Sequence, residues 1–81
     1  MKSRFLGRYL RQKREIANIS QVALAKKLSI TSQFVSNWER GTCSPPTKYY
    51  KKICKLLSIP HDVFADFILA EALEDILRAL K

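Results

Sequence analysis

Prolines divide a chain whose apolar residues otherwise show helical spacing throughout. Pro45 and Pro46 are consecutive, and Pro60 follows after one more short segment. A proline cannot continue a helix, because it lacks the backbone N–H and its ring clashes with the preceding turn. No apolar run alternates over the length of a strand. We therefore expect an all-α protein with helices over about 3–18, 21–28, 32–40, 47–57 and 61–81, the last of which could break near Asp66.

Eighty-one residues are enough for one hydrophobic core but not for two. We expect a single five-helix domain, in which residues 1–60 form the core with the first four helices and residues 61–81 add an extended C-terminal helix. No apolar run approaches the roughly 20 residues that span a bilayer. The N-terminus also lacks the apolar region of a secretory signal. A cytoplasmic protein that does not contact membranes is expected.

The charge is distributed unevenly along the chain. Residues 1–60 hold thirteen basic and two acidic side chains, a net charge of +11, whereas residues 61–81 hold two basic and five acidic ones, a net charge of −3. This asymmetry favours contact between the first part and a polyanion, with a different role for the second part. The simpler alternative is that the charge only keeps a small protein soluble.

The chain lacks the groups that most enzymes use. Its single histidine, His61, stands beside Asp62 at a helix start, with no nearby nucleophile, metal-ligand cluster or glycine-rich phosphate loop. Cys43 and Cys54 are expected to be free thiols rather than a disulfide or part of a metal site. Cys43 is either a plain loop residue or a redox-sensitive one. We expect a protein that is not an enzyme and needs no metal, cofactor or small-molecule ligand.

Two short helices joined by a few residues, over 21–28 and 32–40, have the pattern of a helix-turn-helix. Ala25 supplies the small residue that is needed where the second backbone approaches the first helix. Ile30 and Val35 supply apolar anchors in the turn and in the second helix. This spacing alone is weak evidence, because many small helical domains contain such a pair.

The identity of the residues is more specific than their spacing. Over about Leu6 to Phe64, the chain resembles the phage repressor and Cro family of Xre-like helix-turn-helix domains. The resemblance rests on Ser20-Gln21-x-x-Leu24-Ala25, Ile30, Val35-Ser36-x-Trp38-Glu39-x-Gly41-x-x-x-Pro45 and Ile53-Cys54-x-x-Leu57-x-Ile59. Ser29 departs from the glycine that the family often has, so the turn is expected to be longer or right-handed. The resemblance implies a bacterial or phage-encoded, sequence-specific DNA-binding transcriptional regulator of repressor or controller type, with Trp38 in its core. Repression and activation use the same fold and are both left open.

The resemblance also implies that the helix over 32–40 is the recognition helix and lies in the major groove of double-stranded DNA. A Gln or Asn amide can bond adenine N6 and N7 together, and a Ser hydroxyl can donate or accept at several base edges. We expect base contacts from the outward-facing residues, the alternative being an ordinary solvated face. These residues are Ser32, Gln33, Ser36 and Asn37.

Contacts with the DNA backbone follow from the same resemblance. Gln21 matches the family position that bonds a phosphate at a helix start, where N–H groups face the anion. Ser20 before it is either the helix cap or a second phosphate ligand. The other backbone candidates are Arg14, Arg40, Ser44 and Lys48. Arg14 and Glu39 stand at positions that pair in several family members, so an ion pair is expected to join the first helix to the recognition helix.

The last helix carries more apolar surface than one short domain can bury. Leu69, Leu73, Ile76 and Leu80 are spaced four, three and four residues apart, and an exposed stripe of this kind marks an interface. We expect a homodimer through these residues, with two recognition helices ~34 Å apart on a pseudo-palindromic operator. A different protein could be the partner. The alternative function is then a protein-interaction module, such as an antitoxin or anti-regulator, that acts through this helix.

Overall fold

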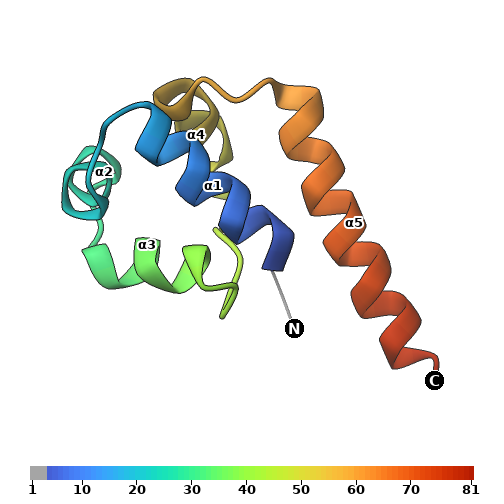
Figure 1. Ribbon diagram of the computed structural model, residues 1–81. Coiled ribbons are helices and arrows are strands. Elements are labelled where there is room, and N and C mark those ends of the chain that lie inside the picture. The colour runs from blue at the N-terminus through green and yellow to red at the C-terminus, as the bar shows by residue number, and fades with distance from the viewer. Residues whose placement is uncertain (1–3) are drawn as a thin grey trace.

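The computed structural model describes residues 4–81, which form a helical bundle with one long helix projecting beside it (Figure 1). The elements are α1 (Arg4–Ile16), α2 (Gln21–Leu28), α3 (Ser32–Glu39), a 3₁₀ turn (Thr47–Tyr49), α4 (Tyr50–Leu57) and α5 (His61–Ala79). No strand occurs within residues 4–81, and the expected all-α, five-helix fold is confirmed. In this same range, no helix is both long and apolar enough to cross a membrane.

Several of the expected helices differ in detail from the structure. The helix expected over 3–18 ends at Ile16, and Asn18 has a φ of 59°. The last helix runs without interruption from His61 to Ala79, so the break considered near Asp66 is wrong. The helix expected over 47–57 starts as a 3₁₀ turn and becomes α-helical only at Tyr50. Pro46 precedes this turn in an extended conformation and cannot donate a backbone hydrogen bond to it.

The turn between α2 and α3 is short and left-handed. Ser20 caps α2, because its hydroxyl accepts a hydrogen bond from the backbone N–H of Ala23 at 3.0 Å. At the other end, Ser29 has a φ of 59°, so the expectation of a longer or right-handed turn is wrong. This conformation directs the N–H groups of Ser29 and Ile30 back to the last carbonyls of α2, with Ile30 donating to Ala25 at 3.0 Å.

The core forms where α1, α3 and α4 meet. Its largest fully buried side chains are Trp38, Leu6, Ile53, Leu57 and Val35. Trp38 is 2% exposed, which confirms its expected place in the core. Helix α5 contributes one fully buried residue, Phe64, while Phe67 and Ile68 are partly buried against the same cluster. The helix-turn-helix is therefore braced from behind by α1 and α4, and most of α5 lies outside this packing.

Helices α1 and α3 approach each other closely at Gly7. A Cβ atom at this position would lie 2.5 Å from the carbonyl oxygen of Trp38 and 2.6 Å from that of Glu39. Both oxygens belong to the backbone at the end of α3, so they cannot turn away as a side chain could. The absence of a side chain at Gly7 thus sets the position of α3 against α1.

Candidate nucleic-acid interface

Helix α3 presents mainly polar side chains to solvent, because two of its three apolar residues are used on the other side and only Phe34, 51% exposed, lies outside the core. Val35 and Trp38 are buried in the core. Ser32, Ser36 and Asn37 are half-buried and Gln33 is exposed. The four residues expected to contact bases thus lie along one accessible side of a short helix that is anchored from behind.

Three side chains on this face are linked to one another. The Gln33 Nε2 donates to the Asn37 Oδ1 at 3.0 Å, and the Arg40 Nη2 donates to the same oxygen at 2.6 Å. Arg40 was expected at the DNA backbone, and the structure places it one turn beyond Asn37 and two turns beyond Gln33. This link was not foreseen from the sequence, although the spacing of 33, 37 and 40 brings such residues together on a helix.

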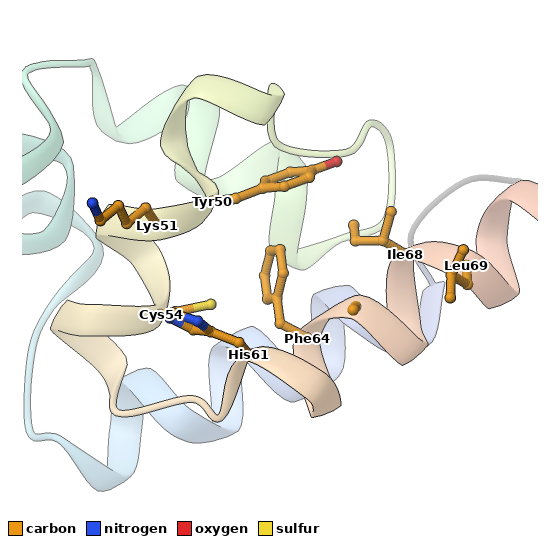
Figure 2. A pocket seen from close by; sticks show the side chains of 8 residues that line it. Tyr50, Lys51, Cys54, His61, Phe64, Ile68 and Leu69 are labelled. Atoms are coloured by element: carbon orange, nitrogen blue, oxygen red, sulfur yellow. The ribbon is translucent and has the colours of Figure 1, made fainter.

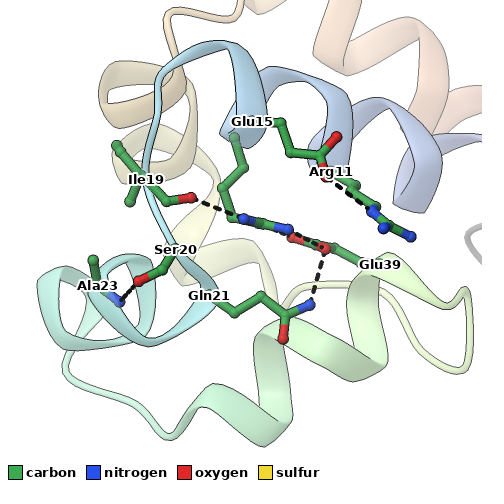
Figure 3. Close-up of polar contacts among 8 residues, drawn as sticks. Arg11, Glu15, Ile19, Ser20, Gln21, Ala23 and Glu39 are labelled. Atoms are coloured by element: carbon green, nitrogen blue, oxygen red, sulfur yellow. Dashed lines mark hydrogen bonds and ion pairs between the residues drawn. The ribbon is translucent and has the colours of Figure 1, made fainter.

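A second network holds α3 to α1 and α2. The Arg14 Nε and Nη2 donate to the two oxygens of the Glu39 carboxylate at 2.6 and 3.1 Å, which confirms the expected ion pair. The Arg14 Nη1 donates to the carbonyl of Ile19 at 2.8 Å. Figure 3 shows Gln21 turned toward Glu39. The Gln21 Nε2 donates a hydrogen bond to the Glu39 Oε1 at 3.0 Å. The Glu39 carboxylate therefore receives hydrogen bonds from both preceding helices.

This network is mostly shielded from water. The side chains of Arg14 and Glu39 are 11% and 4% exposed. The hydrogen bond to Glu39 raises the pKa of Arg14 despite the opposing effect of burial. Arg14, expected at the DNA backbone, has an N–H from each of its three guanidinium nitrogens bonded within the protein. Its position suits it to hold Glu39 and Gln21 in place.

The remaining backbone candidates lie after α3. Lys48 is exposed, and its ammonium lies 5.2 Å from the centre of the Tyr49 ring, which itself packs against Trp38. Ser44 is half-buried, and its hydroxyl donates to the Glu71 Oε1 on α5 at 2.6 Å.

Burial and the nearby Glu71 carboxylate raise the pKa of Tyr50. Sequence reasoning missed Glu71, because nothing in its local pattern shows that it reaches a loop 27 residues earlier.

An apolar groove of about 520 Å³ opens between α4 and α5. Figure 2 shows Phe64 and Ile68 of α5 facing Tyr50 and Cys54 of α4. Burial raises the pKa of the Cys54 thiol, as expected for an unreactive cysteine. An apolar stripe starts at the edge of the groove and continues along α5 to the residue just past its end. Its members are 57% to 77% exposed, namely Leu69, Leu73, Ile76 and Leu80.

Comparisons with known proteins agree with this geometry. The protein family described as Helix-turn-helix matches residues 10–64. A curated relative from Archaeoglobus fulgidus, described as an uncharacterized HTH-type transcriptional regulator, is 41% identical over 54 residues. The match covers 65% of this chain and 24% of the relative, so the chain spans about a quarter of that protein's length. No solved structure matches the chain at a comparable level of significance.

Proposed function

Because this chain belongs to the helix-turn-helix family, we propose that it is a DNA-binding transcriptional regulator, not an enzyme, and that it binds one particular double-stranded DNA sequence as a homodimer. The observation that carries this proposal is the polar face of α3, which stands outward while Val35 and Trp38 fix the helix in the core. A rigid helix with Gln, Asn and Ser side chains is suited to the major groove, where these groups discriminate bases.

The proposed contacts divide by chemistry. Ser32, Gln33, Ser36 and Asn37 contact base edges. The exposed cations Arg40 and Lys48 contact phosphates. Gln21, at the start of α2, and Ser44 are the uncharged residues that contact the DNA backbone. Arg14 supports this surface from behind through its bonds to Glu39 and Ile19. Phosphate neutralisation by the basic first part of the chain supplies affinity that falls with salt, whereas the base contacts supply preference.

Selection of bound duplexes from a random DNA library tests this function directly. At about physiological ionic strength, where non-specific binding is weak, we expect enrichment of one inverted repeat with half-sites separated by about one helical turn. Gln33→Ala should weaken the preference at particular base pairs while thermal unfolding stays unchanged. If the folded protein selects no preferred sequence, α3 does not recognise bases and the proposal is wrong.

The dimer proposal rests on α5. Its exposed stripe and the adjoining groove form a continuous apolar surface that one copy of the chain leaves uncovered. A second copy supplies a matching stripe, and a twofold axis would bring both together. Lys51 lines the groove, and Glu74 and Asp75 stand on α5. An acidic helix packed near the basic α4 of its partner is therefore favoured by charge.

Leu73→Glu is expected to convert the dimer into a monomer, because it places a charge in the middle of the stripe. Sedimentation velocity at micromolar concentration measures the change, and circular dichroism checks that the helices persist. Lys81→Gln alters net charge by the same amount at the end of the chain and should leave the dimer intact. A Leu73→Glu protein that still sediments as a dimer would contradict the assignment of this stripe.

The exposed stripe also favours a second candidate function, in which α5 captures a different protein and DNA binding is secondary. The two candidates separate under the same substitution. Loss of regulation by Leu73→Glu and Ile76→Glu without loss of dimerisation would favour the protein-interaction module. Loss of dimerisation together with loss of affinity for the inverted repeat would favour the dimeric regulator.

A further inference from the structure

We propose that Arg40 fixes the orientation of the Asn37 amide, so that Asn37 selects a base with a keto oxygen, guanine or thymine, instead of pairing with adenine. This inference rests on the proposed function, since it specifies what one position of α3 recognises. It concerns a residue that acts at the base edge, Asn37, and a positioning residue, Arg40, that acts through it.

The orientation follows from the donors that surround Asn37. A guanidinium carries only donors, so the group that faces Arg40 at 2.6 Å must be the amide oxygen and not the amide nitrogen. With that oxygen fixed, the nearer end of the Gln33 amide, at 3.0 Å, must be its nitrogen. The Asn37 oxygen has two lone pairs, and these two donors occupy both.

The atoms left over define what each side chain can recognise. Asn37 retains two N–H donors and no acceptor. Gln33 retains its oxygen and one N–H, which together match the N6 donor and N7 acceptor of adenine. Without a free acceptor, Asn37 cannot accept from adenine N6 or cytosine N4. Guanine accepts from both N–H groups through O6 and N7, and thymine accepts from one through O4. Adenine offers only N7, and its N6 donor then opposes the second N–H of Asn37.

The spacing of the two residues supports separate readings of nearby base pairs. Gln33 and Asn37 are one helical turn apart, about 5–6 Å along α3, while successive base pairs are about 3.4 Å apart. The hydrogen bond between the two amides also removes rotational freedom before DNA arrives, which lowers the entropic cost of binding. The pair thus presents a fixed order of donors and acceptors along the helix.

Two substitutions of Asn37 test the proposal on the selected DNA site. Asn37→Ala locates the base pair whose preference depends on this side chain, and the wild-type protein should prefer guanine or thymine there by at least about fivefold. Asn37→Asp keeps the shape and the bond to Arg40 but presents an acceptor to the base. Its preference at that position should change to cytosine or adenine, even though its overall affinity falls through repulsion by the phosphates. Competition binding with the four single-position variants measures these ratios.

Arg40→Met tests the positioning role. Loss of the guanidinium frees one lone pair of the Asn37 oxygen, so the discrimination against adenine at that position should weaken at least about fivefold. Lys48→Met is the matched control, because it also removes one exposed cation but does not touch Asn37. It should lower affinity for all sequences alike and leave every base preference in place.

The outcomes separate this inference from the proposed function. A clear inverted repeat with adenine or cytosine at the Asn37-dependent position, or with an unchanged preference in Asn37→Asp, overturns the inference and leaves the regulator proposal standing. The same holds if Arg40→Met and Lys48→Met have equal effects on base preference. Failure of the folded wild-type protein to select any sequence overturns both.

Discussion

Replacement of Glu39 by alanine is expected to lower the free energy of unfolding by about 3–5 kcal/mol. The lost carboxylate accepts two hydrogen bonds from Arg14 and one from Gln21. Because the Arg14 side chain is almost fully covered, the substitution leaves a buried positive charge without a counter-ion. Urea unfolding followed by the fluorescence of Trp38, the single tryptophan and a core residue, measures the loss.

An exposed ion pair on α1 provides the matched control for this result. The Arg11 Nε and the Glu15 Oε2 lie 3.3 Å apart, and more than half of each side chain is exposed to solvent. Glu15→Ala should therefore cost less than about 1 kcal/mol. Replacing both Arg14 and Glu39 by methionine should recover most of the loss, because no charge is left buried alone. Equal losses from Glu39→Ala and Glu15→Ala would contradict the structural role assigned to Glu39.

Gly7→Ala is expected to lower the free energy of unfolding by about 1–2 kcal/mol. Helix propensity alone predicts a gain of about 1 kcal/mol for this change. The new methyl group would however overlap two backbone oxygens at the end of α3, and overpacking of this kind costs about 1–3 kcal/mol and occasionally more. Gly7→Val should be worse, because its branched side chain adds bulk at the same place. Thermal unfolding followed by circular dichroism measures both variants, with an expected fall in Tm of about 10 °C for alanine.

Arg8→Ala, at the neighbouring exposed position of α1, controls for the general effect of alanine in this helix. It should change the stability by no more than about 0.5 kcal/mol. A Gly7→Ala protein as stable as the wild-type protein, or more stable, would contradict this prediction. The gain from helix propensity would then exceed the cost of steric overlap, and the close approach of α1 to α3 would not require glycine.

The helix-turn-helix was predictable because its determinants are local. Apolar spacing placed α2 correctly, and the hydroxyl of Ser20 marked its start. The buried positions of Val35 and Trp38 followed from the three-residue spacing of a helix face. The Arg14–Glu39 pair spans 25 residues, and its prediction came from the resemblance to a family rather than from any local pattern.

The features that escaped prediction depend on contacts between distant parts of the chain or on local backbone strain. A glycine within α1 lowers helix propensity and gives no sign of the helix end that it approaches. The bond between Ser44 and Glu71 joins a loop to the last helix, and neither residue has a neighbour that indicates it. Ser29 adopts the left-handed region that its residue type disfavours, because the turn satisfies the last carbonyls of α2.

The two halves of α5 differ in their contact with the core. The core cluster and the side chains packed against it extend along the chain to Ile68, and no apolar residue from 69 to 81 belongs to them. Apart from Glu71, which accepts a hydrogen bond from Ser44, substitutions in this distal half therefore do not reach the packing that supports α3. A new choice of partner, or a new distance between two DNA-binding surfaces, then needs no compensating change in the core.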